Sequence, residues 1–431
     1  ITTDQFAGVA PDEIIDPRAF CELLRQAFTF HPEFAGLPRK FKIAVNGARE
    51  DRAVVQVHDI GLELLRNEAG EIGFRVLVGG GLGRTPIIGA VIREFLPWQH
   101  ILTYTEAILR VYNRWGRRDN AYKARIKILV KALGAEEFAR QVEAEWQHDK
   151  DGPNTLTQEE LDRVVAQFAP PAYERKNDEA LAAQVAADKA FAAWVRRNVH
   201  AHRVAGYRAV TISLKPTGIA PGDITDAQMD LVADLADAYS FGEIRASHEQ
   251  NLILADVPSE SLHALWSKLK AAGLATPNVG LITDIICCPG GDFCSLANAK
   301  SIPIAEAIQR QFDDLDYLHD IGDLELNISG CMNSCGHHHV GHIGILGVDK
   351  TGSEWYQISI GGRQGSQARL GDVIGPSFAA EEVPGVIQKL IDAYVDHRHD
   401  DELFIDTVLR LGIEPFKTRV YGAAKKEASH V

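Results

Sequence analysis

The chain has 431 residues, of which 45% are apolar and 24% charged, an ordinary composition for a globular protein of two or three domains. A formal net charge of −14 argues against a general nucleic-acid binder and against adhesion to an anionic membrane, because both need a surplus of basic residues. No apolar run reaches the roughly 18–20 residues of a membrane helix, and the first residues lack the features of a signal peptide, so we expect a cytoplasmic protein.

The first segment combines predicted strands with a glycine-rich loop and a basic cluster. Alternating apolar residues predict a strand at 74–78 that runs into the sequence GGGLGR at 79–84. Glycines in such a loop let backbone N–H groups approach an anionic ligand. The sequence LPRKFK at 37–42 brings three positive charges together, and on a strand Lys40 and Lys42 would project to the same face.

The middle of the chain changes character twice. Residues 101–200 follow helical patterns. Residues 203–275 then predict the order β-α-β-β-α, with the sequence TDAQ from Thr225 as a capping box before the first helix, and this is most of a ferredoxin-like unit. We therefore expect three domains, at 1–202, 203–275 and 276–431.

Two distant segments share the same order of predicted strands and glycines. The sequence KIAVNG opens the first segment and ELNISG the second, and each segment ends in a glycine-rich loop. The glycines recur at equal spacings: Gly47 and Gly61 match Gly330 and Gly344, and Gly70 and Gly79 match Gly352 and Gly361. These matches predict an internal duplication, with two unrelated β-hairpins as the alternative. Cysteines occur only in the second of the two segments.

Five of the six cysteines lie in two short sequences, CCPGGDFC at 287–294 and GCMNSC at 330–335. They are too few and too clustered for a disulfide framework, so we interpret them as a metal site. The remaining Cys21 lies on a predicted helix and is interpreted as a small buried hydrophobe. Cys287 is adjacent to Cys288 and is also interpreted as packing, because neighbouring residues rarely point to the same place.

The cysteine spacing favours an iron–sulfur cluster over zinc. Cys288 and Cys294 are separated by five residues and Cys331 and Cys335 by three, whereas structural zinc sites favour about two between paired ligands. A 4Fe–4S cluster takes one thiolate for each iron at wider and more varied spacing. The nearby histidines are interpreted as structural or as lying at the edge of the substrate site; they are His337, His338, His339 and His342. A zinc-stabilised binding protein and a non-catalytic iron–sulfur electron carrier stay open as alternatives.

The cysteine sequences, together with LPRKFK and the duplicated glycine-rich strands, resemble the sirohaem- and 4Fe–4S-dependent nitrite and sulfite reductases, most closely the haemoprotein of the assimilatory sulfite reductases. The resemblance extends over nearly the whole chain. It implies an α+β fold in which duplicated sirohaem-binding α/β domains surround a ferredoxin-like half domain. It also implies six-electron reduction of sulfite to sulfide in sulfur assimilation, with reduction of nitrite to ammonia as an alternative that shares every motif.

The same resemblance implies roles for individual residues. Lys40 and Lys42 would face the oxyanion substrate, and Cys335 would be shared between the cluster and the sirohaem iron. The cluster ligands would be Cys288, Cys294, Cys331 and Cys335. The residues that would bind sirohaem are Arg39, Arg84, Arg125 and Asn333, with Arg363 added from the repeat alone.

The sequence also bears on the electron donor and on the extent of the chain. The glycine-rich loop at 79–84 lacks the context of a flavin or nicotinamide fingerprint, so electrons would come from a partner, either a flavoprotein or a ferredoxin. Members of the family carry a further stretch before the position of Ile1, with the other half of the ferredoxin-like domain. We therefore expect residues to be missing upstream, and we expect this chain alone to hold sirohaem weakly, to aggregate and to show little sulfite reduction.

Overall fold

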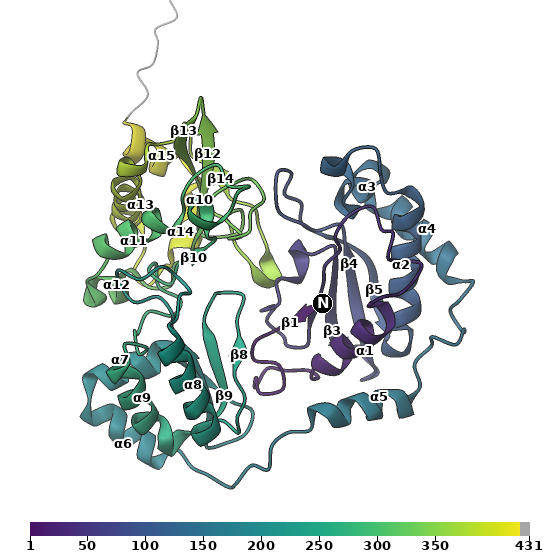
Figure 1. Ribbon diagram of the computed structural model, residues 1–431, viewed down its shortest axis with the longest axis horizontal. Coiled ribbons are helices and arrows are strands. Elements are labelled where there is room, and N and C mark those ends of the chain that lie inside the picture. The colour runs from purple at the N-terminus through teal and green to yellow at the C-terminus, as the bar shows by residue number, and fades with distance from the viewer. Residues whose placement is uncertain (423–431) are drawn as a thin grey trace, which may run out of the picture. The chain divides into compact units, whose positions relative to one another are not determined.

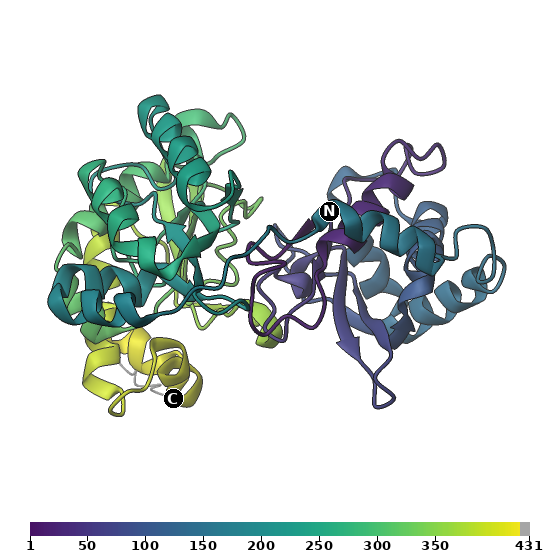
Figure 2. The same cartoon turned by 90° about the horizontal axis from the view of Figure 1, so that it is seen from below.

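The structure is a computed structural model that describes residues 1–422. Its elements are shown from two directions in Figures 1 and 2. Contacts between residues divide the chain into two compact units. The first unit consists of Ile1–Asn177, Ala201–Ala209 and Gly365–Ala368. The second unit consists of Asp178–His200, Val210–Gln364 and the residues from Arg369 onward.

A five-stranded sheet forms the centre of the first unit, in the order β1-β2-β3-β4-β5. Its strands are β1 Thr2–Thr3, β2 Ile43–Asn46, β3 Ile60–Arg66, β4 Ile72–Val78 and β5 Ala90–Pro97. The first two pairings are parallel and the two that follow are antiparallel. Strand β2 is buried along its whole length, whereas β3 alternates toward its end, with Leu62 and Leu64 buried and Arg66 exposed.

Helices pack around this sheet within residues 1–177. They are α1 Arg18–Phe28, α2 Ile101–Trp115, α3 Ile126–Leu133, α4 Ala135–Trp146 and α5 Gln158–Val165. The helical character predicted from residue 101 onward is confirmed. Helix α5 begins at a capping box in which Thr157 and Glu160 bond each other's backbone N–H groups. An edge-to-face contact between Phe20 on α1 and Phe74 on β4, with ring centroids 5.0 Å apart, holds α1 on the sheet.

The second unit contains a sheet of the same design, in the order β10-β11-β12-β13-β14. Its strands are β10 Ile286–Cys287, β11 Leu326–Ser329, β12 Ile343–Lys350, β13 Ser353–Ile360 and β14 Asp372–Val373. Again the first two pairings are parallel and the next two antiparallel. The accompanying helices are α10 Gly290–Phe293, α11 Ile302–Gln311, α12 Leu315–Ile321, α13 Val383–His397, α14 Phe404–Leu411 and α15 Glu414–Tyr421.

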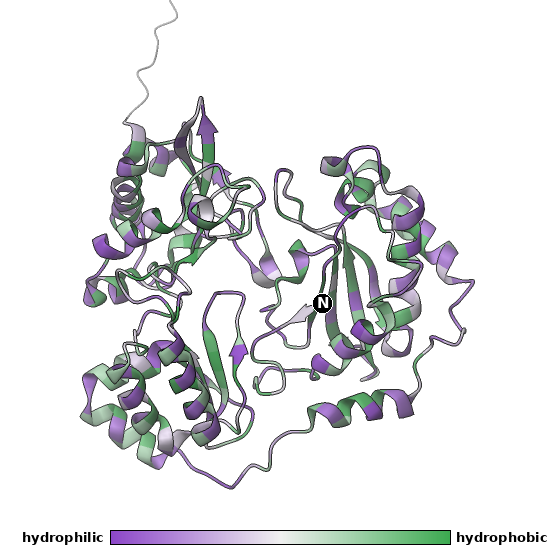
Figure 3. Cartoon of the chain, viewed as in Figure 1, coloured by the Kyte–Doolittle hydropathy of each residue, from purple (hydrophilic) through white to green (hydrophobic). Residues whose placement is uncertain are grey.

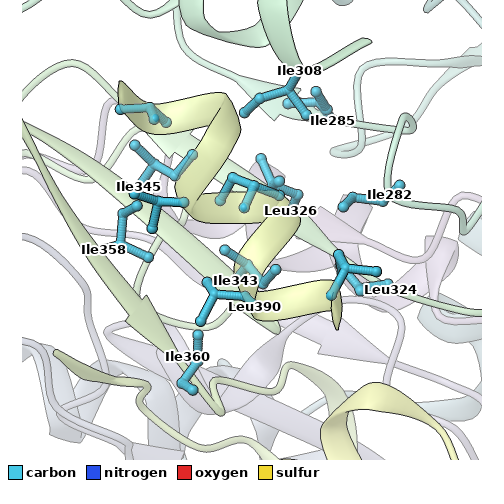
Figure 4. Close-up of a cluster of buried hydrophobic side chains, with 14 of the residues drawn as sticks. Ile282, Ile285, Ile308, Leu324, Leu326, Ile343, Ile345, Ile358, Ile360 and Leu390 are labelled. Carbon is cyan, nitrogen blue, oxygen red and sulfur yellow. The ribbon is translucent and has the colours of Figure 1, made fainter. Parts of the chain in front are cut away.

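The core of this sheet is built mainly from isoleucine and leucine. Figure 4 shows Ile345 and Ile358 from neighbouring strands in the same buried cluster as Leu390 of α13. All three side chains are fully buried. Burial on this scale supplies most of the stabilisation of the sheet, because each such side chain contributes roughly 1.5–3 kcal/mol on leaving water.

Matched backbone details confirm the internal duplication. Ile43 on β2 lies opposite Ile60 on β3, just as Leu326 on β11 lies opposite Ile343 on β12. Val54 precedes Ile60 by the same number of residues as His337 precedes Ile343. Both have a left-handed backbone conformation, with φ of 55° and 56°. Such a conformation is uncommon for residues other than glycine, so its recurrence rules out two unrelated hairpins. We call β1–β5 with its helices the first copy and β10–β14 with its helices the second copy.

A four-stranded sheet in the order β6-β7-β9-β8 lies between the copies in the sequence. Its strands are β6 Val199–Ala201, β7 Tyr207–Ile212, β8 Arg245–Ala246 and β9 Leu252–Pro258. Its helices are α6 Glu179–Ala187, α7 Lys189–Asn198, α8 Asp226–Tyr239 and α9 Leu262–Ala271. The predicted order β-α-β-β-α is confirmed, as is the capping box at Thr225 with Gln228. Helices α6 and α7 pack here as well, with Phe191 and Trp266 centroids 5.4 Å apart.

Helices α1 and α14 are the most clearly amphipathic. Hydrophobic and hydrophilic residues are mixed along the helices in Figure 3, and an apolar stripe of this kind suits a helix that covers one face of a sheet. Among the helices of residues 1–422, none combines the length and the apolar character that crossing a membrane requires.

Candidate functional site

The two cysteine sequences form two loops of the second copy that contact each other. We call residues 288–301, which follow β10, the first cysteine loop, and residues 330–340, which follow β11, the second cysteine loop. Cys288 continues the sheet by donating its backbone N–H to Ile328 O at 3.1 Å. Its Sγ in turn accepts the N–H of Gly330 at 3.1 Å. Gly330 O then accepts from the N–H groups of Asn298 and Ala299. Gly330, at the start of the second cysteine loop, is therefore bonded to both ends of the first.

Glycine at 330 is required by this close approach. A Cβ on Gly330 would lie 2.6 Å from Ala299 O and 2.8 Å from the Cα of Gly290, both closer than van der Waals contact allows. Glycine is required at 290 for the same reason, because a Cβ there would lie 2.4 Å from the backbone N of Ser301. The glycines seen in the sequence around the cysteines therefore serve loop-to-loop packing.

The four cysteines of these loops have different exposure. Cys331 is buried, Cys288 and Cys294 are half-buried, and Cys335 is exposed. The hydroxyl of the buried Ser301 lies 3.5 Å from Cys288 Sγ. Four thiols on two joined loops are the donor set that a 4Fe–4S cluster needs, with one thiolate for each iron. Within residues 1–422 no three His, Cys, Asp or Glu side chains lie close enough together to hold one metal ion, and this includes the four thiols.

The other two cysteines are packed. Cys287 is buried in the core of the second copy, and its Sγ donates to Cys288 O at 3.2 Å. Burial raises the pKa of the Cys287 thiol. Cys21 lies on α1, with its Sγ 3.8 Å from Thr2 O, and burial raises its pKa to about 12. Both side chains therefore remain neutral thiols near neutral pH, consistent with their interpretation as packing.

Two histidines, His338 in the second cysteine loop and His342 just after it, are buried and neutral. Neither ring nitrogen of His338 has a hydrogen-bond partner among the described residues. Burial lowers the pKa of His338 to about 3 and that of His342 to about 4. His342 Nδ1 accepts the backbone N–H of Glu325 at 3.1 Å, which is a structural contact. Asn333, on the second cysteine loop, is exposed.

The basic residues of the first copy surround a buried carboxylate, Asp59. Lys42 donates its backbone N–H to Asp59 Oδ2 at 2.9 Å. Arg125 donates Nε and Nη2 to Asp59 Oδ1 at 3.1 and 2.7 Å. Burial raises the pKa of Asp59 against the opposing charge of Arg125. Asp59 was not singled out by the sequence, because nothing local distinguishes it from a surface aspartate.

Lys40 and Lys42 do not lie on a strand, and that expectation was wrong. Strand β2 begins at Ile43, and the residues before it have irregular backbone. The reason is that the N–H of Lys42 bonds the side chain of Asp59 instead of a neighbouring strand. Both lysines are exposed, as is Arg39.

The glycine-rich loop at 79–84 is held by a lysine that sequence reasoning missed. Lys127 is buried and donates its Nζ to the carbonyl oxygens of Leu82 and Thr85, both at 2.7 Å. Burial lowers its pKa to about 8. Gly81 leaves room for Arg125, since a Cβ there would lie 3.1 Å from Arg125 Nη2. Arg84, at the end of the loop, is exposed.

The second copy carries different residues at the equivalent of this basic cluster. Glu325 precedes β11 as Lys42 precedes β2, and His342 precedes β12 as Asp59 precedes β3. Burial raises the pKa of Glu325 to about 7. Arg363, the candidate added from the repeat, lies 3.8 Å from Asp406. The basic cluster is therefore confined to the first copy among the described residues.

The first copy also has an equivalent of the cysteine loops, without cysteine. Ala10 N donates to Phe6 O at 3.0 Å as Cys294 N donates to Gly290 O at 2.9 Å. Ile14 N donates to Gly47 O as Asn298 N donates to Gly330 O, at 2.7 and 2.8 Å. Counting from these matches, the equivalents of Cys288, Cys294, Cys331 and Cys335 are Asp4, Ala10, Ala48 and Arg52.

An ion pair occupies the place of two of the thiols. Arg52 Nε donates to Asp4 Oδ2 at 2.8 Å, and Arg52 Nη2 donates to Asp12 Oδ1 at 2.9 Å. The Asp4 side chain is only 2% exposed. The first copy thus joins its two loops by charged hydrogen bonds between side chains. The sequence comparison did not reveal this pair because the match between the two segments begins at Lys42, and Asp4 lies before that point.

Comparison with known proteins places these features in a family. The family described as the nitrite and sulphite reductase 4Fe-4S domain matches residues 1–150 and 280–428, and the nitrite/sulfite reductase ferredoxin-like half domain matches residues 200–272. Sulfite reductase (ferredoxin) 1 of Mycolicibacterium paratuberculosis is 27% identical, with 95% of this chain and 69% of the relative covered. Ferredoxin–nitrite reductase of Synechococcus elongatus is 28% identical, with 91% and 71% covered.

An assimilatory ferredoxin-dependent nitrite reductase of Haloferax mediterranei is 29% identical, with 94% of this chain and 66% of the relative covered. Among solved structures, the NirA protein of Mycobacterium tuberculosis shares the fold with a TM-score of 0.75 at 24% identity, covering 96% of this chain and 71% of that one. The matches to the 4Fe-4S domain fall on the two copies and the third match on the ferredoxin-like sheet. The chain therefore belongs to the nitrite and sulfite reductase family of oxidoreductases.

Proposed function

We propose that this protein carries out the six-electron reduction of sulfite to sulfide, in sulfur assimilation, at a sirohaem coupled to a 4Fe–4S cluster. One observation carries the proposal: two glycine-clamped loops, joined by the hydrogen bond from Gly330 to Cys288 Sγ, present four thiols in a member of this family. We assign Cys288, Cys294, Cys331 and Cys335 as the cluster ligands, and Cys335 as the thiolate shared with the haem iron. The exposure of Cys335 is consistent with a ligand that must reach a second cofactor.

The basic residues of the first copy would supply positive charge for the substrate, and Asp59 would hold some of them in place. A coupled haem and cluster supply electrons in succession at one site. Lys40 and Lys42 offer exposed ammonium groups that attract an oxyanion and stabilise negative charge on its oxygens. Asp59 holds the backbone of Lys42 and the guanidinium of Arg125, so the guanidinium needs little reorganisation when an anion binds.

We further assign a set of polar residues to the sirohaem carboxylates. Arg125 and Arg84 lie beside and at the end of the glycine-rich loop, and Asn333 lies between Cys331 and Cys335. The full set is Arg39, Arg84, Arg125 and Asn333. We also propose that the protein has three domains, at 1–202, 203–275 and 276–431.

Nitrite is the second candidate substrate, reduced to ammonia with the same cofactors. The observation in its favour is that relatives named as nitrite reductases are 28% and 29% identical to this chain, as similar as the sulfite reductase at 27%. The names of all three relatives specify ferredoxin. We therefore propose ferredoxin rather than a flavoprotein as the electron donor. We also propose a cytoplasmic location.

A visible spectrum of the purified protein, followed by kinetics, tests this proposal. We expect the Soret and red bands of sirohaem, weak when this chain is expressed alone, together with iron and acid-labile sulfide in equal amounts beyond the haem iron. Steady-state rates with sulfite and with nitrite, using reduced ferredoxin and then a chemical reductant, decide the substrate and the donor. A broad brown shoulder without a Soret band would support the electron carrier instead, and a protein containing only zinc would contradict the proposal.

A further inference from the structure

One glutamine of the ferredoxin-like sheet binds the backbone next to a proposed cluster ligand. Gln250 Oε1 accepts the N–H of Cys287 at 2.8 Å, and its Nε2 donates to Cys287 O at 2.8 Å. Strand β10, which ends at Cys287, is the edge of its sheet, with β11 on its other side. The side-chain amide thus satisfies both backbone groups that a further parallel strand would otherwise bond.

The backbone of Gln250 is strained in a way that favours a functional role. Its φ is 63°, a left-handed conformation that glycine and asparagine adopt far more readily than glutamine. Gly222 lies against it, where an added Cβ would come 3.2 Å from Gln250 Cβ. The turn itself is closed by Gln250 N bonding Ser247 O at 3.1 Å. A long side chain kept at a position suited to glycine indicates that its amide is needed.

A buried ion pair anchors the same turn to the segment before β10. Lys215, whose side chain is fully buried, donates Nζ to Asp284 Oδ1 at 2.6 Å and to Glu249 O. Asn251 Nδ2 donates to Asp284 Oδ1 at 3.1 Å. Glu249 and Asn251 flank Gln250, so the backbone from which its side chain reaches Cys287 is held on both sides.

These contacts leave the backbone at Cys287 and Cys288 little freedom. Gln250 holds Cys287 from one side, while Ile328 O accepts the N–H of Cys288 from the other. We propose that Gln250 is a positioning residue that sets the direction of the Cys288 thiolate, so that the ferredoxin-like sheet controls the retention and electronic properties of the cluster. This inference rests on the proposed function, in which Cys288 is a cluster ligand.

Three substitutions at Gln250 distinguish the effect of losing the hydrogen bonds of its amide from the effect of relieving its backbone strain. Gln250→Met keeps the length and loses both hydrogen bonds, while Gln250→Glu can accept from Cys287 N but cannot donate to its carbonyl. Gln250→Gly relieves the positive φ and also loses the amide. The matched control is Gln228→Met in the same sheet domain, which loses the capping box at Thr225 and the bond from Gln228 Nε2 to Ala272 O at 2.9 Å, far in sequence from the cysteines.

Iron release to a chelator and the EPR spectrum of the reduced cluster are the readouts, with the iron and sulfide content measured first. We expect Gln250→Met and Gln250→Gly to release iron about ten-fold faster or more than wild type, because two hydrogen bonds to the ligand segment are lost. Gln250→Glu should lie between, and the EPR signal should change in all three variants. Gln228→Met should release iron at the wild-type rate with an unchanged EPR signal.

The outcomes distinguish this inference from the proposed function. A wild-type chain that takes up no cluster would contradict the proposed function itself. A wild-type chain that loads normally, with Gln250→Met and Gln250→Gly retaining iron and EPR signal as wild type does, would overturn the positioning role alone. If Gln250→Met does not fold, Gln250→Gly, which relieves strain, and Gln250→Glu decide the question in the same way.

Discussion

The thiols of the second copy differ in their surroundings, and this predicts which can be replaced. Cys335 is exposed on the second cysteine loop, whereas Cys287 is buried with its Sγ on a neighbouring carbonyl. We expect Cys335→Ser to lose the cluster, disturb the haem spectrum and abolish activity, because in the proposed function this one thiolate serves both cofactors. Cys287→Ser and Cys21→Ser should leave the absorption spectrum nearly unchanged. Loss of the cluster in Cys287→Ser, with Cys288→Ser unaffected, would show that the ligand assignment is wrong.

The lysines before β2 are expected to act through charge alone. Lys42→Met, or Lys40→Met, should lower kcat/KM for the oxyanion by at least about ten-fold, equivalent to about 1.4 kcal/mol, with cofactor content near normal. An ammonium group close to a partly desolvated anion contributes more than one on the open surface. Lys131→Met on α3, an exposed lysine of the same unit, is the control. Unchanged kinetics in both variants would identify Lys40 and Lys42 as ordinary surface residues.

Glu325 predicts a pH dependence of stability. Burial raises its pKa to about 7, so the folded protein keeps this proton at pH values where the unfolded chain, titrating near 4.5, has lost it. Between these values the unfolded state binds fewer protons, and the free energy of unfolding falls as pH rises. Relative to wild type, Glu325→Gln should gain about 2–3 kcal/mol between pH 5 and pH 8. Denaturant unfolding of the cofactor-free protein at both pH values measures this, and a constant difference would contradict it.

At the scale of elements, the ion pair of the first copy joins the loop after β1 to the loop after β2. We expect Arg52→Met to lower the free energy of unfolding of the first unit by about 3–5 kcal/mol, because Asp4 is left as a buried, unpaired carboxylate. The double variant Asp4→Asn/Arg52→Met should recover part of the loss. The exposed Arg25, paired with Glu22 on α1, is the control, and Arg25→Met should leave the free energy of unfolding nearly unchanged. Equal effects of Arg52→Met and Arg25→Met would refute this account of the loops.

At the scale of the whole molecule, the two copies share a backbone design but hold their loops by different means. If the four cysteines hold the cluster as proposed, its removal with a chelator should make the two cysteine loops sensitive to proteolysis, because four thiolate bonds to iron would be lost there. The equivalent loops of the first copy, at 4–15 and 47–58, should stay protected, since Arg52 bonds Asp4 and Asp12 without any metal. Mass spectrometry of the first cleavage sites checks this. Cleavage that starts at 47–58 instead would show that the copies do not differ in this way.

Much of the architecture could be predicted from local patterns. The capping box at Thr225 and the helical periodicity involve residues within one or two turns of each other, so the sequence alone contains the information. The glycine spacings revealed the duplication because a close backbone approach, as at Gly61 and Gly344, and a positive φ, as at Gly70 and Gly352, both select glycine whichever residues surround it. The two cysteine sequences stood out because they contain five of the six cysteines of the chain. Their interpretation as metal ligands accounts for this clustering.

The tertiary structure alone decided the contacts between residues that are distant in the sequence. Asp59, Lys127 and the pair of Arg52 with Asp4 look like ordinary charged residues until folding buries them and gives each a partner. Lys42 was misjudged for the same reason, because Asp59 takes the N–H that strand pairing would have used. Gln250 shows the limit most clearly: its amide bonds Cys287, 37 residues away, from a backbone conformation that its own side chain does not favour. Local preference is set by a residue and its neighbours, whereas desolvation and hydrogen bonding are set by whatever the fold brings beside it.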